Sequence, residues 1–178
     1  MGGGVKRWRL ATSWVPDRAG DPPLTTAALR QGATDPITFT CGPAGSGIRL
    51  GVDRDEDGVL NRDDCASADG SAWAPTQETA GVLLNGTVAT ALSWNEQATL
   101  SGPGARYDVA GATLSALRSA GLGSAACLAS GLTSPSFTDT RPSPPAADGN
   151  YYLVRARNAC GTATFGPGRA AADSLVCP

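Results

Sequence analysis

Residues 53–64, DRDEDGVLNRDD, concentrate six of the chain's sixteen acidic residues in twelve consecutive positions. Like charges this close repel one another unless a positive charge lies among them. The stretch contributes two arginines, Arg54 and Arg62, while the whole chain of 178 residues has a net charge of −2. This concentration indicates either a metal-binding loop or a solvated acidic loop without an ion.

The spacing of the acids favours a calcium site. A twelve-residue calcium loop places side-chain oxygens at positions 1, 3, 5, 9 and 12, a backbone carbonyl at position 7 and glycine at position 6. Counted from Asp53, Gly58 falls at the sixth position and Asp63 offers an additional acid beside the twelfth. Magnesium fits less well, because it demands octahedral geometry and keeps its waters. We therefore expect Ca²⁺ to be bound by Asp53, Asp55, Asp57, the carbonyl of Val59, Asn61 through a water, and Asp64.

The segments around the loop predict a structural role for the ion. Residues 47–52, GIRLGV, resemble a strand, and residues 66–80 are small, polar and unpatterned, as in a linker. A calcium sensor instead opens a groove between two packed helices. Residues 1–65 thus form an N-terminal segment that ends in the calcium loop. It contains one short helix over 21–32, capped by Asp21, and a short strand over 35–41.

Residues 81–178 have the texture of a β-protein. Short alternating runs are separated by turn residues, and Asn85-Gly86 is a strong hairpin-turn dipeptide. The clearest run covers 150–161 and places Tyr152, Val154 and Ala156 on one face. Residues 114–122 have helical spacing, and we expect a short helix or an irregular edge there. Strands at this spacing predict a β-sandwich of roughly 100 residues.

The cysteines and the absence of histidine limit the metal sites and catalytic groups that the chain can form. The chain has five cysteines, no closely spaced pair of them and no histidine, which disfavours zinc. Disulfides in an oxidising compartment are favoured over buried thiols, and an odd count leaves one thiol over. Without histidine, Ser-His-Asp and Cys-His catalysis are excluded, and we expect no enzyme. Arg106, Arg155 and Arg157 fall near one another, where we expect a solvated sheet face.

Two stretches resemble known families. The sequence DRDEDGVLNRDDC resembles the calcium loops of thrombospondin type 3 repeats and of related bacterial spacer segments. It is also similar to one half of a dockerin, although a dockerin has two such loops with a helix after each. In the C-terminal part, ALSW with Trp94, RYDV with Tyr107, and YYLVRARNACG resemble strands of a bacterial fibronectin type III domain.

The second resemblance implies a fold and a role. It implies a mainly β chain, with an immunoglobulin/fibronectin III-like β-sandwich over 81–178 that follows the small calcium-loop segment. The family acts as a spacer and has no catalytic residues. The resemblance also implies a Cys127–Cys177 disulfide, with a pairing that involves Cys160 as the alternative.

These observations predict a non-catalytic, calcium-stabilised spacer or adhesion module of a secreted or cell-surface bacterial protein. No signal peptide is recognisable, so we expect a fragment of a longer protein. The expected partners are calcium, other domains of that protein, and extracellular polysaccharide or protein. Nucleic acid and a membrane span are not expected. The alternative is a carbohydrate- or protein-binding accessory module beside a missing catalytic domain, which an exposed strip of Trp or Tyr on one sheet face would favour.

Overall fold

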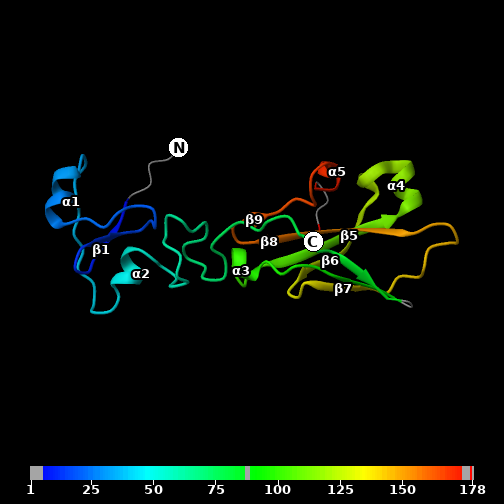
Figure 1. Ribbon diagram of the computed structural model, residues 1–178, viewed down its shortest axis with the longest axis horizontal. Helices are drawn as coiled ribbons and strands as arrows, with labels where there is room; N and C mark the ends of the chain where they lie inside the picture. The colour runs from blue at the N-terminus through cyan, green and yellow to red at the C-terminus, as the bar shows by residue number, and fades with distance from the viewer. Residues whose placement is uncertain (1–5, 87–88, 174–176, 178) are drawn as a thin grey trace. The chain divides into compact units, whose positions relative to one another are not determined.

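The computed structural model describes residues 6–86, 89–173 and 177. The chain divides into two compact units, Met1–Trp73 (unit 1) and Ala74–Pro178 (unit 2) (Figure 1). The stretch 66–80 is therefore shared between the units. Across the described part of the chain, no helix is both long and apolar enough to cross a membrane.

Unit 1 begins with a small antiparallel hairpin of β1 (Trp8–Leu10) and β2 (Trp14–Pro16). Trp14 is also bridged to Leu24, and its Nε1 donates to Thr26 Oγ1 at 3.0 Å. Few apolar side chains are fully buried in this unit, namely Leu29, Val52 and Ala72. A core this small contributes little stability, so unit 1 depends on other interactions.

The predicted helix over 21–32 is present but shorter, as α1 (Thr26–Gly32). Asp21 does not cap it; the Thr25 side chain accepts a hydrogen bond from the Ala28 N–H instead. A residue that precedes a proline disfavours helical geometry, and this applies to Asp21 and Pro22. Leu24, after the two prolines, is extended because it pairs with Trp14. The helix therefore begins only after this stretch.

Two further predictions for unit 1 are wrong. Residues 35–41 belong to no strand, because none of the described sheets offers them a partner, and Phe39 stays 56 % exposed beside Trp14. The expected strand over 47–52 is mostly helical, as α2 (Gly47–Gly51). Ser46 turns back on Pro43 through both its N–H and its hydroxyl, and this turn directs the chain into a helix.

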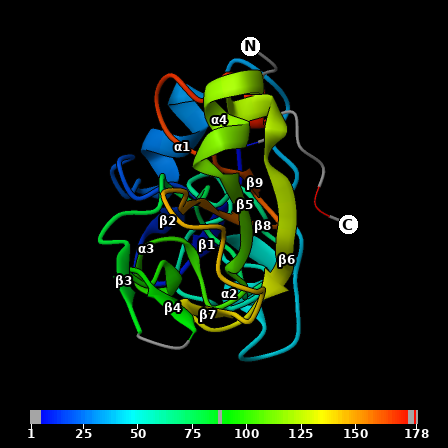
Figure 2. The same ribbon diagram turned by 90° about the vertical axis from the view of Figure 1, so that its right-hand side faces the viewer.

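Unit 2 is an antiparallel sandwich of two sheets (Figure 2). The smaller sheet has the order β3-β4-β7 and the larger one β6-β5-β8-β9. The strands are β3 (Leu83–Asn85), β4 (Thr90–Ser93), β5 (Arg106–Thr113), β6 (Ala126–Leu132), β7 (Ser136–Asp139), β8 (Asn150–Asn158) and β9 (Gly161–Thr162). The short helices are α3 (Ala98–Ser101), α4 (Leu114–Ala120), the 3₁₀ turn η1 (Gly121–Ser124) and α5 (Ala170–Asp173). The predicted mainly β fold with a β-sandwich in the C-terminal part is confirmed.

The inner faces of the two sheets enclose the main core of unit 2. Trp94 follows β4 and meets Tyr107 of β5 edge to face, with ring centroids 5.4 Å apart. Tyr107 is 1 % exposed, and its hydroxyl accepts the N–H of Gln97 at 2.8 Å. The predicted alternation in β8 is confirmed, since Val154 and Ala156 join this core. The other buried or half-buried members are Leu92, Val109, Leu128, Ala129, Leu132, Phe137 and Tyr152.

The outer face of the larger sheet is covered as well. A second apolar cluster joins Ala110 of β5 and Leu153 of β8 to Phe165 and Ala172, which lie beyond the last strand. Phe165 and Ala172 are 3 % and 1 % exposed. The segment after β9 is therefore part of the packed structure of unit 2.

A buried carboxylate at the end of β7, Asp139, forms an ion pair with Arg141. The Asp139 carboxylate, 4 % exposed, accepts three hydrogen bonds from the Arg141 side chain and one from its backbone N–H. It also accepts the Tyr152 hydroxyl at 2.8 Å. The Arg141 guanidinium contributes most to lowering the pKa of Asp139 from 3.8 to about 2, and burial opposes this effect.

The depressed pKa predicts acid sensitivity. The folded pKa of Asp139 lies below its unfolded value, so its stabilisation is complete above pH 4 or so and is lost as pH falls toward about 2. The stabilisation amounts to roughly 2 kcal/mol. We expect Tyr152→Phe to raise the Asp139 pKa and to reduce this acid-dependent loss. The measurement is urea unfolding of unit 2 as a function of pH, with the Asp139 titration followed by NMR.

A matched control is Tyr151→Phe, because the Tyr151 hydroxyl lies near Ser124 and not near Asp139. An identical pH dependence in both variants would contradict the assignment of the pKa shift to this network.

Candidate metal centre

The acidic loop starts directly from α2. The N–H groups of Val52 and Asp53 both donate to the Ile48 carbonyl, at 2.8 and 3.0 Å, so the helix end fixes the first acid. The loop is closed across its base, where the Asn61 N–H donates to Val52 O at 2.9 Å and the Arg54 N–H donates to Asn61 Oδ1 at 3.0 Å. The twelve residues are thus folded as one closed turn.

Asp53 holds the turn from inside. It is 6 % exposed, and its two carboxylate oxygens accept the N–H groups of Glu56 at 2.8 Å and Gly58 at 3.1 Å. The tight path takes Glu56 to φ 61° and Gly58 to φ 93°. A Cβ at Gly58 would meet no neighbouring atom, so glycine is favoured there by its backbone angle alone.

Three other acids of the loop have carboxylate oxygens without a hydrogen-bond partner. Both oxygens of Asp55, Oδ2 of Asp57 and Oδ2 of Asp64 are buried and accept no hydrogen bond. Ligand oxygens of Asp53, Asp55 and Asp57 lie within 4.8 Å of one another. Oxygens bound to one Ca²⁺ at 2.3–2.6 Å lie no farther apart than about 5 Å, so this spacing fits a shared ion.

Asp64 lies within the electrostatic reach of the other three acids. Burial raises its pKa, and the charges of Asp55, Asp57 and Asp53 raise it further. Its Oδ1 accepts the Ala66 N–H at 2.7 Å, whereas its Oδ2 is buried without a hydrogen-bond partner. The structure therefore brings together the ligand oxygens of the predicted acids at positions 1, 3 and 5, and the acid at position 12, Asp64, lies within electrostatic reach of all three.

The remaining predicted residues have other contacts. The side-chain oxygen of Asn61 accepts the Arg54 N–H, and the Val59 N–H donates to Asp57 Oδ1 at 2.8 Å. Asp63, expected as an additional acid, instead pairs with Arg18 at 3.4 Å and accepts the Ala19 N–H.

One of the two arginines of the loop, Arg62, pairs with an acid outside the cluster. Arg62 lies 3.6 Å from Asp21, outside the cluster. Among the described ion pairs, none neutralises Asp53, Asp55 or Asp57.

The sequence did not predict that the chain after Asp64 packs over the acidic loop. The chain after Asp64 turns back so that a Cβ on Gly70 would lie 3.4 Å from the Asp55 carbonyl oxygen and 3.6 Å from Asp57 Cβ. Ala72 of the same stretch is completely buried. Small side chains carry no hydrophobic period, so a sequence pattern cannot distinguish a close-packed cover from a linker. The sequence signal that could have indicated this packing was the high proportion of Gly and Ala beside the acids.

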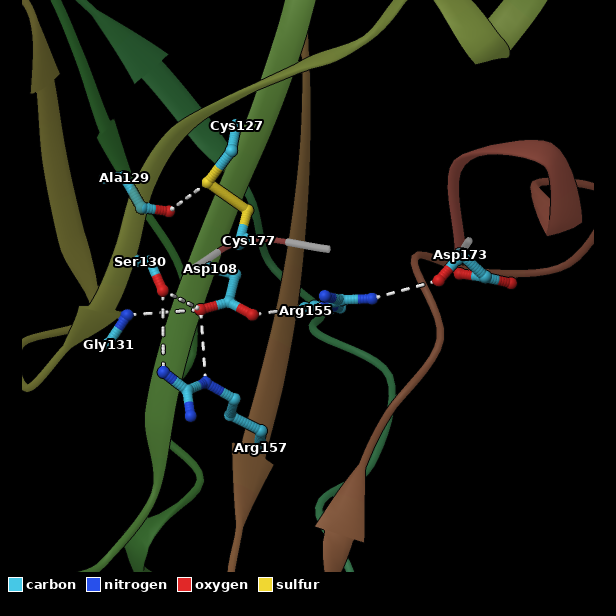
Figure 3. Close-up of a disulfide and its surroundings, with 9 residues drawn as sticks. All are labelled: Asp108, Cys127, Ala129, Ser130, Gly131, Arg155, Arg157, Asp173 and Cys177. Atoms are coloured by element: carbon cyan, nitrogen blue, oxygen red, sulfur yellow. Dashed lines mark hydrogen bonds and ion pairs between the residues drawn. A yellow bond between two sulfur atoms is a disulfide. The ribbon is translucent and has the colours of Figure 1, made fainter. Parts of the chain in front are cut away.

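A second charged cluster lies in unit 2 and includes the arginines expected on a solvated face. Asp108 of β5, 1 % exposed, accepts the Nε groups of Arg155 at 3.3 Å and Arg157 at 3.2 Å from β8. Figure 3 shows the carboxylate between these arginines and Ser130 and Gly131 of β6, which also donate to it. The expectation of a solvated face is wrong for Arg155, which is 8 % exposed.

Arg155 also joins the sheet to the segment after β9. Its guanidinium carbon lies 4.7 Å from the centroid of the Phe165 ring, and its Nη1 donates to the Asp173 carbonyl at 3.3 Å. The Asp173 carboxylate in turn accepts the Phe165 N–H at 2.7 Å. This cluster has a structural explanation, because its donors hold three elements of unit 2 together.

The expected Cys127–Cys177 disulfide is present and connects β6 to the end of the chain across a sequence separation of 50 (Figure 3). Cys65 and Cys160 are also disulfide-bonded. All five cysteines lie in the described part of the chain, and Cys41 is the free one, exposed to solvent. The prediction of disulfides with one thiol left over is confirmed.

Comparisons with known proteins add little to this picture. No family model matches the chain. No curated protein matches it either. One solved structure, a Fn3-like protein from Clostridium thermocellum, is similar with 22 % sequence identity and a TM-score of 0.33, over 53 % of this chain and 88 % of that one. The sandwich assignment therefore depends on the strand order of this chain itself.

The geometry of the loop predicts an effect of Gly58→Ala. Alanine at φ 93° is strained, which costs about 1–2 kcal/mol. We expect local destabilisation of residues 47–73, measured by hydrogen exchange with mass spectrometry. Gly20→Ala is the control in the same unit, because a Cβ there meets nothing and no unusual backbone angle is required. Equal exchange in both variants would show that the turn at Gly58 does not limit the stability of the loop.

Proposed function

We propose that this chain is a non-catalytic spacer or adhesion module of a secreted or cell-surface bacterial protein, and that Ca²⁺ holds unit 1 in its folded form. One observation carries the calcium assignment: the buried, unpartnered carboxylate oxygens of Asp55, Asp57 and Asp64. Burying an ionised carboxylate without a partner is strongly unfavourable. A divalent cation among them removes this cost and satisfies all three side chains.

The donor set supports calcium over other metals. Every side chain that faces the cluster offers oxygen, while zinc sites use imidazole and thiolate, and the chain has no histidine. Carboxylate oxygen is a hard ligand, typical of Ca²⁺ and Mg²⁺ sites. Mg²⁺ is dehydrated reluctantly and demands near-ideal octahedral geometry, whereas Ca²⁺ accepts an irregular loop with several carboxylates.

The residues proposed to hold the ion follow from the contacts. Asp55 has two uncommitted oxygens, and Asp57 and Asp64 have one each. Asp53 contributes from the first position while it holds the turn, and the Val59 carbonyl and a water beside Asn61 complete the proposed set of ligands. Bound calcium supplies positive charge and no reaction, so its effect is to stabilise the fold of a unit that buries few apolar side chains.

The spacer or adhesion role is supported by unit 2. Its buried carboxylates Asp108 and Asp139 are both satisfied by arginines of the same unit. The disulfides favour an oxidising compartment, in accord with secretion or display at the cell surface. For the alternative, a carbohydrate-binding module, each Trp and Tyr of the chain is buried or half-buried. The exposed aromatic strip that would favour it is therefore not found among the described residues.

Calorimetric titration of the full chain with Ca²⁺ tests the proposal. We expect one site in the unmodified protein and a loss of affinity of at least about tenfold in Asp55→Ala, which removes two uncommitted oxygens. Asp63→Ala is the matched control. It removes the same charge from the same loop, but its carboxylate faces Arg18, so we expect its affinity to stay within a small factor of the unmodified protein.

Hydrogen exchange with and without chelator gives a second measurement. Calcium at a hundred times its Kd stabilises a folded unit by about 2.7 kcal/mol, and we expect this protection in residues 47–73 rather than in the sandwich. The absence of binding heat, or equal heat in Asp55→Ala and the unmodified chain, would reject calcium. Residues 53–64 would then be an acidic loop without an ion.

A further inference from the structure

The exposed end of the β3–β4 hairpin differs from the two-residue turn that Asn85-Gly86 predicts. Asn85 is the last residue of β3 and pairs with Ala91 of β4, so Gly86 begins a longer connection. Asn85 and Gly86 are both exposed. The dipeptide therefore lies in solvent at the end of an edge strand.

The two residues contact each other in a specific way. Gly86 lies beyond the last pair of the ladder, and its backbone N–H donates to Oδ1 of the Asn85 side chain at 2.8 Å. This places the Gly86 nitrogen beside Cγ, the carbon that carries Oδ1. Reactions between groups already held at contact distance gain large rate factors, because the approach has been made in advance.

Glycine is required at position 86 by the backbone. Its φ is +125°, and a Cβ built there would overlap the carbonyl oxygen of Ala89. Side chains at the following residue ordinarily shield an asparagine from its neighbour's nitrogen. The same backbone that demands glycine thus leaves the Asn85 amide open to attack.

We propose that Asn85 is a site of spontaneous deamidation through the Gly86 nitrogen. Solvent base removes the Gly86 amide proton, and the nitrogen forms a bond to Asn85 Cγ. The Cγ–Nδ2 bond breaks, and the amide group leaves as ammonia after it takes a proton from water. The product is a five-membered succinimide. Water then opens either carbonyl of the ring, which yields aspartate or isoaspartate, and no oxidant or cofactor takes part.

The product changes the edge strand. Both forms add one negative charge beside three exposed apolar residues of the same edge, Val82, Leu83 and Leu84. The isoaspartate form also inserts Cβ into the backbone at the last paired position of β3. Because β3 pairs only with β4 among the described strands, this insertion weakens the attachment of the strand to the sheet.

Timed incubation of the full chain at neutral pH, followed by peptide mapping with mass spectrometry, tests the proposal. Asn158 is the internal control: its Nδ2 donates to the carbonyls of Ala74 and Ser101, and its Oδ1 accepts the Cys160 N–H. We expect Asn85 to lose ammonia about tenfold faster than Asn158, or more. Isoaspartate is then detected by its methylation with an isoaspartyl carboxyl methyltransferase.

Two comparisons separate the folded hairpin from the bare dipeptide. A synthetic peptide of residues 81–90 gives the rate without the fold, and we expect the folded protein to match or exceed it. Asn85→Gln keeps an amide but requires a larger ring, and we expect it to remove the signal. Reaction at Asn85 no faster than at Asn158, or slower than in the peptide, would overturn the proposal.

Discussion

Both units of this chain bury carboxylates, and the folded structure depends on how those charges are neutralised. In unit 2 the chain supplies its own cations. Asp108 is satisfied by Arg155 and Arg157 across two adjacent strands, and Asp139 by Arg141 two residues away. In unit 1 none of the described ion pairs includes Asp53, Asp55 or Asp57; Arg18 and Arg62 pair with Asp63 and Asp21. The same physical requirement leads to internal ion pairs in one unit and to a proposed ion in the other.

The two units also differ in the interactions that stabilise their backbone conformation. The sandwich has two apolar clusters, one on each face of its larger sheet. Unit 1 has a hairpin of two three-residue strands and two short helices around very few buried apolar side chains. Its acidic loop is organised by hydrogen bonds from backbone N–H groups to Asp53, Asp57 and Asp64, which is why the loop keeps a defined shape with so little core. Side-chain carboxylates thus take the role in unit 1 that hydrophobic packing takes in unit 2.

Sequence patterns predicted the parts of this structure that repeat a known period or spacing. The alternation in residues 150–158 marked β8 and its inner face, and the three acids at the first, third and fifth positions of the twelve-residue spacing, Asp53, Asp55 and Asp57, lie close together. Sequence patterns gave wrong predictions where tertiary contacts determine the local structure or the burial of a residue. Residues 35–41 alternate but have no partner strand, residues 47–51 become helical after a turn at Pro43, and Arg155 is buried because the segment beyond β9 lies over it. No hydrophobic periodicity in the sequence indicated that Gly70 lies against the loop, because small residues pack closely without a periodic pattern.

The disulfide between Cys127 and Cys177 decides how this sandwich would carry a mechanical load. Tension applied from beyond Cys177 enters the fold at β6 through the sulfur–sulfur bond, and not along the weakly paired β9. The segment between the two cysteines, which contains β7, β8 and β9, is bypassed by the covalent path and cannot be extended until the bond is reduced. From β6 such a load would pass to β5, the strand that joins β6 to β8 in the larger sheet.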